Sequence, residues 1–320
     1  MNCFFIINQH SRNGRSRRRT EELFNLLKAS GITYSHSFTE SLDHARQLSQ
    51  KANQEGAECI VAVGGDGTIN NVLNGFFNEQ GNRISRTKMA ALHTGTSPDF
   101  CKSYGIPRSL EGAVQAICRG MTSLVRVGMI ECRKSPGGKS AEIPMRPLFF
   151  GCCANIGLGA SLARAANSGI RKYLGDIVGT FVSLLVILLR YHPSTVTLTI
   201  DEKKHTVSRV FDIAVGRTRY IASGIKVQHQ LGPLDPRLYV MSVRGLNAFN
   251  FIKVMKTLYS GNAISANDTR LSLMHGSRIE IASDTPLEVE FDGDPAGYCP
   301  CTITIAPDPL ELIVGGHDAG

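Results

Sequence analysis

Five consecutive residues, Gly64, Gly65, Asp66, Gly67 and Thr68, constrain this chain more than any other feature of its sequence. An apolar run at 59–63 leads directly into them and predicts a buried strand. The residues that follow place apolar side chains on one face of a helix: Ile69, Val72, Leu73, Phe76 and Phe77. The sequence therefore predicts a strand, a glycine turn and a helix, in that order.

A turn of this kind is suited to binding an anion. Glycine lets the backbone bend tightly and approach a ligand, and N–H groups at a helix N-terminus can converge on a phosphate. Asp66 would repel a phosphate unless a cation lies between them, so it predicts a nucleotide bound with Mg²⁺, with Asp66 near the metal. No Gly-Lys-Ser/Thr follows the glycines, which excludes a Walker A loop, and the GxGxxG pattern is also missing. A glycine turn without a ligand is the simpler alternative.

The first part of the chain alternates strand and helix patterns. Apolar runs at 4–7, 32–38 and 59–63 read as strands, and the segments between them carry helical spacing. This alternation predicts an open, mostly parallel α/β sheet, in which ligands bind at the carboxyl ends of the strands. The residues that we expect to share this nucleotide-binding edge are Asn8, Thr39, Gly64, Gly65, Asp66, Gly67, Thr68, Asn70 and Thr96.

The pattern changes after about Leu124, and 320 residues are enough for two domains. Short β-rich runs recur between turn signals, with one helical interruption at about 170–190, which predicts a β-rich sandwich-like or barrel-like second domain. We expect a nucleotide-binding domain at 1–124 and a β-rich domain at 125–305. The C-terminal segment, 306–320, either ends the second domain or returns to the first.

Charge and cysteine usage limit the partners and the compartment. The net charge of +8 favours anionic partners, such as nucleotides or an anionic membrane surface. Nucleic acid is not expected, because basic residues and aromatics do not interleave. The nine cysteines are scattered, and the N-terminus does not resemble a signal peptide, so we expect a cytoplasmic protein with reduced thiols. Five arginines between positions 12 and 19 form either a solvated helix start or a contact for an anion.

The order of motifs resembles the diacylglycerol kinase catalytic family, which includes bacterial lipid kinases and the sphingosine and ceramide kinases. The resemblance rests on segments that span nearly the whole chain: Ile6-Ile7-Asn8, the GGDGT-Ile-Asn-Asn-Val-Leu-Asn-Gly run at 64–75, 95–100, 155–159, 234–238 and Asp292-Gly293-Asp294. The chain departs from the family pattern at Pro98, at Pro236 and at Asp294, where the family has glutamate. NAD kinases share GGDGT and are the alternative, but the Asn78-Glu79 pair comes too early for theirs.

This resemblance implies an ATP-dependent kinase that phosphorylates a hydroxyl of diacylglycerol or a similar lipid, working with Mg²⁺ at a membrane surface. By the resemblance, Asp294 is the general base, with Asp292 as the second choice. A second Mg²⁺ would bind Asp235 with the backbone carbonyls near Gly232 and Arg237. Taken alone, both segments also read as ordinary turns. A catalytically weak homologue that binds nucleotide or lipid is a further alternative, and a homodimer is left open.

Overall fold

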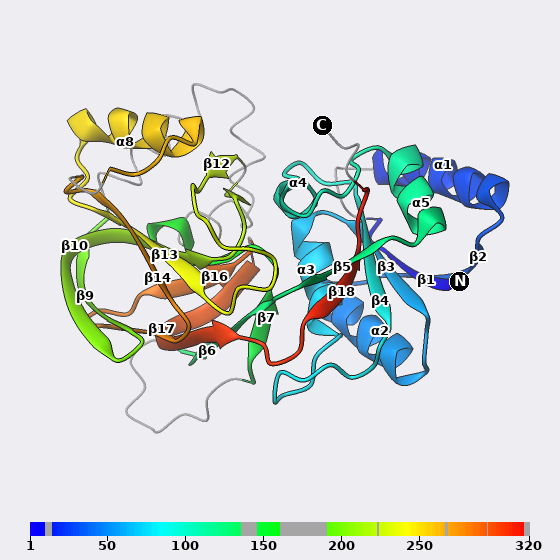
Figure 1. The fold of residues 1–320 in the computed structure, drawn as a ribbon, viewed down its shortest axis with the longest axis horizontal. Helices are drawn as coiled ribbons and strands as arrows, with labels where there is room; N and C mark the ends of the chain where they lie inside the picture. Colours follow the sequence, from blue (N-terminus) through cyan, green and yellow to red (C-terminus); the bar gives the residue numbers. More distant parts are fainter. Residues whose placement is uncertain are drawn as a thin grey trace.

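The chain forms two lobes that lie side by side (Figure 1). The structure, a computed structural model, describes residues 1–9, 15–135, 146–160, 191–222, 224–265, 268–292 and 294–316. Arg12 and the helix expected at about 170–190 lie outside the described residues. Within the described part of the chain, no helix is both long and apolar enough to cross a membrane.

The first lobe is an α/β domain built on a six-stranded sheet with the strand order β2-β1-β3-β4-β18-β5. All neighbours in it pair in parallel except β18 and β5, so the predicted open, mostly parallel sheet is confirmed. The strands are β1 (Asn2–Ile7), β2 (Thr33–Phe38), β3 (Cys59–Gly64), β4 (Lys88–His93), β5 (Thr122–Val125) and β18 (Leu310–Ile313). The helices are α1 (Arg15–Ser30), α2 (Leu42–Gln54), α3 (Asp66–Asn74), α4 (Asp99–Ser103) and α5 (Leu110–Arg119).

The uniformly apolar sequence of β3 follows from burial of both faces of the sheet. Ile60 and Ala62 point into a core shared with α2 and α3, whereas Val61 and Val63 point into a core shared with α1 and α5. A strand with helices on both sides reads as a continuous apolar run, because alternate side chains enter different cores. This arrangement fixes β3 at the centre of the domain and the glycine turn at its carboxyl end.

The C-terminal segment lies in the first sheet, between β4 and β5. Leu310 and Leu312 of β18 enter one core, and Ile313 enters the other. The chain therefore crosses between the lobes twice, once after β5 and once before β18 (Figure 1).

The second lobe is an antiparallel sheet that closes on itself. The strands pair in the order β10-β8-β16-β17-β15-β9, and β9 pairs again with β10. Closure depends on the length of β10, whose first half pairs with β9 and whose second half pairs with β8 and β13. Its register shifts between Val207 and Val210, where Arg209 has a φ of 54°. Such a bulge bends the strand, so that β10 can pair with β9 before the bulge and with β8 and β13 after it.

The strands of this lobe match the β-rich runs expected from the sequence. They are β6 (Gly128–Arg133), β7 (Leu148–Phe150), β8 (Cys153–Gly157), β9 (Ser194–Ile200), β10 (Lys203–Gly216), β11 (Tyr220–Ile221), β12 (Ile225–Lys226), β13 (Leu238–Arg244), β14 (Leu271–Gly276), β15 (Ile279–Ser283), β16 (Glu288–Phe291) and β17 (Asp294–Ile305). Helix α8 (Ala248–Ser260) covers the outer face of β13 with Phe251, Val254 and Leu258. The position of α8 was not predicted, although Asn247 and Asn250 form a capping box at its start.

Candidate active site

Four neighbouring strands of the first sheet end at the same edge, and polar residues follow each of them. The hydrogen-bond ladder continues one residue past the strands: Asn8 N donates to Val63 O at 2.9 Å, and Thr39 N donates to Ile7 O at 2.9 Å. The Asn8 side chain then donates from Nδ2 to Thr68 Oγ1 at 2.9 Å. The structure therefore brings Asn8, Thr39 and the glycine turn together at one edge of the sheet.

The glycine turn is formed by a close approach of two backbone segments. A Cβ atom added to Gly95 would lie 2.7 Å from the Gly65 Cα atom, and one added to Gly64 would overlap the Thr68 side chain. At Gly65, by contrast, the nearest atom to an added Cβ is 3.6 Å away, so the space there is open. Gly65 is the N-cap of α3 and, having no side chain, does not pair with the first N–H groups of the helix.

Asp66 is a half-buried carboxyl group in a strongly acidic environment. Its Oδ2 accepts the Asp99 N–H at 3.1 Å, whereas the buried Oδ1 has no hydrogen-bond partner among the described residues and lies 3.6 Å from His93 Nε2. Burial, with the charges of Asp292 and Asp99, raises the pKa of Asp66 to about 8. A buried oxygen in such surroundings is suited to a cation, which would favour the ionised form. The residues at this turn therefore fit a bound nucleotide with Mg²⁺.

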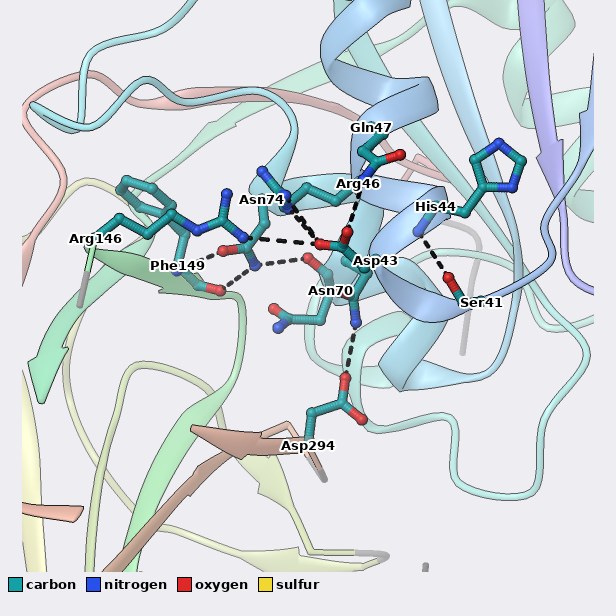
Figure 2. Close-up of polar contacts among 11 residues, drawn as sticks. Ser41, Asp43, His44, Arg46, Gln47, Asn70, Asn74, Arg146, Phe149 and Asp294 are labelled. Atoms are coloured by element: carbon teal, nitrogen blue, oxygen red, sulfur yellow. Dashed lines mark hydrogen bonds and ion pairs between the residues drawn. The ribbon is translucent and has the colours of Figure 1, made fainter. Parts of the chain in front are cut away.

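Asp294 comes from the second lobe and lies against the glycine turn of the first. Asn71 Nδ2 donates to Asp294 Oδ2 at 2.8 Å and to Gly67 O at 2.9 Å. A Cβ added to Gly67 would lie 3.1 Å from Asp294 Oδ1, so the carboxylate faces bare backbone. Figure 2 shows Asp294 reaching from the start of β17 toward α3. Burial and the charge of Asp292 raise the pKa of Asp294 to about 6, close to the range that suits a general base.

Asp292 has a different role, because its carboxylate is used to hold the backbone. It accepts N–H groups from Gly151 at 2.9 Å, Cys152 at 3.2 Å and Cys153 at 3.0 Å. Burial raises its pKa to about 6, although these hydrogen bonds act in the opposite direction. Its backbone φ of 47° belongs to the left-handed region, as expected at a tight turn. The geometry favours Asp294 over Asp292 as a base, since three donors already surround Asp292.

Sequence reasoning did not single out two asparagines of α3 that join the lobes. Asn71 holds Asp294, and Asn74 exchanges two hydrogen bonds with Phe149 of β7, donating to its carbonyl at 2.6 Å and accepting its N–H at 2.8 Å (Figure 2). Asn74 is buried, and so is its neighbour Asn70. The available signal was the presence of three asparagines on one short helix whose apolar residues predict burial, because buried amides must find partners.

The second magnesium site expected at Gly232, Asp235 and Arg237 does not fit the structure. The carbonyl oxygens of Gly232 and Arg237 accept hydrogen bonds from the Arg217 guanidinium at 3.2 and 2.8 Å. The Asp235 carboxylate is paired with the Arg237 side chain, with Oδ2 at 2.8 Å from Nη2. Among the described residues, no three His, Cys, Asp or Glu side chains are grouped as metal ligands.

Comparison with known proteins gives matches over both lobes. Residues 2–130 match the family described as the diacylglycerol kinase catalytic domain, and residues 153–314 match the YegS C-terminal NAD kinase beta sandwich-like domain. An uncharacterised protein of Synechocystis is 23% identical over 282 residues, which cover 85% of this chain and 58% of that protein. A diacylglycerol kinase of Staphylococcus aureus is 29% identical over 128 residues, which cover 40% of this chain and 39% of that enzyme. The chain thus matches less than two thirds of the length of these relatives.

Solved structures show the same fold. A crystal structure of a diacylglycerol kinase from Bacillus anthracis has a TM-score of 0.68 at 18% identity and covers 98% of this chain and 96% of that one. A second crystal structure from the same organism has a TM-score of 0.72 at 18% identity, with the same coverage. At these identities the similarity shows the architecture of both lobes.

Proposed function

Since the chain belongs to the diacylglycerol kinase catalytic family, we propose that it is an ATP-dependent kinase that phosphorylates the hydroxyl of diacylglycerol or of a similar lipid. One observation carries the proposal: a carboxylate of the β-rich lobe, Asp294, lies against Gly67 of the phosphate-type turn. Phosphoryl transfer needs an acceptor hydroxyl held between a base and the γ-phosphate. Asp294 and the glycine turn lie beside each other, so a base and the proposed phosphate-binding backbone are close enough to serve one acceptor hydroxyl.

The nucleotide is assigned to the edge formed by Asn8, Thr39, the glycine turn and Thr96. The open N-terminus of α3 would bind the phosphates through its backbone N–H groups, and the glycines at positions 64 and 95 keep side chains out of that space. Asp66, with its unpartnered buried Oδ1, would hold Mg²⁺, which compensates phosphate charge when bound. The asparagine at position 70 completes the predicted set from the buried side of α3.

Asp294 is the residue that we assign to the acceptor hydroxyl. Asn71 occupies Oδ2, which fixes the carboxylate and leaves Oδ1 to take the hydroxyl proton. Asp294 stands where the family pattern has glutamate, and its side chain is one methylene shorter. The carboxylate of Asp294 therefore extends less far toward the acceptor hydroxyl. Substitution by glutamate tests whether a longer side chain with the same carboxylate still supports transfer.

The lipid substrate implies work at a membrane surface. We propose that the protein binds anionic membranes peripherally, since its net charge is +8 and each basic residue near an anionic surface contributes about 1 kcal/mol. This association would be reversible and weakened by salt, because the attraction between exposed charges is screened.

Transfer of labelled phosphate from ATP to a panel of diacylglycerol, sphingosine and ceramide in mixed micelles tests the proposal, with NAD as a separate acceptor. We expect transfer to a lipid and a loss of about 10²–10⁴-fold in kcat for Asp294→Asn with ATP affinity retained. Asp294→Glu should keep activity, and Asp284→Asn, an exposed aspartate on another turn, is the matched control.

Three outcomes would overturn parts of this assignment. Phosphorylation of NAD but of no lipid would favour the NAD-kinase alternative. Binding of ATP without transfer to any acceptor would indicate a regulator that binds nucleotide. Normal turnover by Asp294→Asn would remove Asp294 from the role of base while leaving the nucleotide site in place.

A further inference from the structure

The loop 232–237 is organised around the guanidinium of Arg217. Nη1 donates to the carbonyl oxygens of Asp235 at 2.7 Å and Arg237 at 2.8 Å, and Nη2 donates to those of Gly232 at 3.2 Å and Pro233 at 3.0 Å. Arg217 is buried, with 7% of its surface exposed. Four carbonyl oxygens of one short loop therefore converge on a single buried positive charge. We call these four oxygens the carbonyl cluster.

The only carboxylate of this loop, that of Asp235, is paired with Arg237. Asp235 Oδ1 accepts from the Arg237 N–H at 2.9 Å and from Arg237 Nε at 3.0 Å, and Oδ2 accepts from Nη2 at 2.8 Å. This pairing lowers the pKa of Asp235 to about 2. Its negative charge is thus compensated by an exposed arginine of the same turn, and it is not available to a second cation at the cluster.

We propose that Arg217 is the resident cation of the 232–237 loop and that this chain binds no divalent metal there. Carbonyl oxygens and a nearby aspartate are the ligands that Mg²⁺ or Ca²⁺ uses in proteins, at about 2.0–2.6 Å. Here the same oxygens are the acceptors of a guanidinium, whose planar fork can serve two acceptors from each terminal nitrogen. A divalent ion would have to displace that fork and overcome the repulsion between like charges.

Backbone hydrogen bonds also connect Arg217 and the loop to the candidate active site. The backbone N–H of Arg217 donates to Cys152 O at 3.1 Å, and the Cys152 N–H donates to the carboxylate of Asp292 at 3.2 Å. In addition, Pro233 O accepts the Arg126 N–H at 3.2 Å, at the point where the chain first crosses from one lobe to the other. Through its side chain Arg217 holds the loop, whose Pro233 contacts the crossing segment, and through its backbone it contacts the turn that holds Asp292.

Metal content and amide hydrogen exchange of the full chain test the claim that no divalent metal binds at the 232–237 loop. After dialysis against a chelator, the protein should retain no stoichiometric metal. Addition of Mg²⁺ or Ca²⁺ without nucleotide should leave exchange in the 230–238 peptides unchanged, whatever happens in the peptides that contain Asp66. Because exchange is read peptide by peptide, binding at the glycine turn cannot be mistaken for binding at the loop. Metal-dependent protection of 230–238 would overturn the inference.

A matched pair of variants tests the claim that the Arg217 guanidinium holds the loop. Arg217→Met keeps an unbranched apolar stem and removes the guanidinium with its charge and donors, and we expect exchange in 230–238 to become about tenfold faster or more. Arg237→Met removes the exposed guanidinium and spares the carbonyl cluster, so the loop should exchange at nearly the wild-type rate. If Arg217→Met does not fold, Arg217→Lys, which cannot serve four acceptors in a plane, takes its place. Wild-type exchange in the Arg217 variant would show that the guanidinium does not hold the loop.

Discussion

Replacement of Asp66 by asparagine should stabilise the metal-free protein above neutral pH while it removes binding of ATP with Mg²⁺. Asparagine has nearly the same shape, and its oxygen can still accept the Asp99 N–H that Asp66 Oδ2 accepts at 3.1 Å. What it lacks is the negative charge, which burial and the charges of Asp292 and Asp99 oppose. The substitution therefore separates two effects of the negative charge: the loss of folding stability and the binding of ATP with Mg²⁺.

The size of the effect follows from proton linkage. The pKa of Asp66 is raised from 3.8 to about 8 in the folded protein. Between these values the folded protein holds a proton that the unfolded chain has released, so this group makes stability fall as pH rises from about 4 to about 8. A difference of about four pKa units corresponds to roughly 6 kcal/mol as an upper bound, at about 1.4 kcal/mol for each unit. Because Asp292 and Asp99 share the repulsion, we expect a relative gain of about 2–3 kcal/mol for Asp66→Asn.

Urea denaturation in a chelator at about pH 5 and about pH 9 measures this gain as a change in the free energy of unfolding. The difference between Asp66→Asn and wild type should be larger at the higher pH, whereas Asp284→Asn should show no such trend. Calorimetric titration with ATP and Mg²⁺ measures the expected loss of nucleotide binding by Asp66→Asn. An equal difference at both pH values would refute the claim that the surroundings of Asp66 oppose its charge.

Three further outcomes are expected. The acid limb of the pH–rate profile should lie near pH 6, because Asp294 must be ionised to act as base, and Asn71→Leu should move it to higher pH by removing a donor that lowers the pKa of Asp294; an unmoved limb would exclude Asp294 as its source. Gly65→Val should fold, as circular dichroism would show, yet bind ATP weakly, since its added Cβ has space within the protein but enters the phosphate opening; unchanged affinity would contradict the nucleotide site. Sedimentation with anionic vesicles should show binding that is lost at high salt, and binding that ignores salt would argue against the electrostatic contact.

The glycine turn and the strand edge beside it could be predicted because they depend on local patterns. The run at 59–63, the glycines after it and the apolar spacing of α3 define strand, turn and helix within about twenty residues. Once alternation indicates a parallel sheet, the carboxyl ends of its strands must lie together, which places Asn8 and Thr39 beside the turn. The strands of the second lobe could also be predicted, because alternating apolar residues and turn residues are local signals.

The contacts that complete the site could not be predicted in the same way. Asn71 and Asp294 are 223 residues apart, and nothing in either segment specifies that their side chains meet. The resemblance ranked Asp294 above Asp292, but it could not show that Asp294 faces Gly67 whereas Asp292 holds three backbone N–H groups. Such a distinction depends on the register of β16 and β17 and on how the two lobes pack.

By itself, the sequence determined the change from an α/β to a β-rich pattern, the glycine turn between β3 and α3 and the strand edge at which that turn lies, since all three follow from periodicity and backbone preference over short stretches. Only the tertiary structure decided that β10 closes the second sheet, that β18 returns to the first and that Arg217 fills the carbonyl cluster of the 232–237 loop. These features join segments that are distant in the chain. They are set by packing and by the need of buried polar groups for partners, which no local pattern encodes.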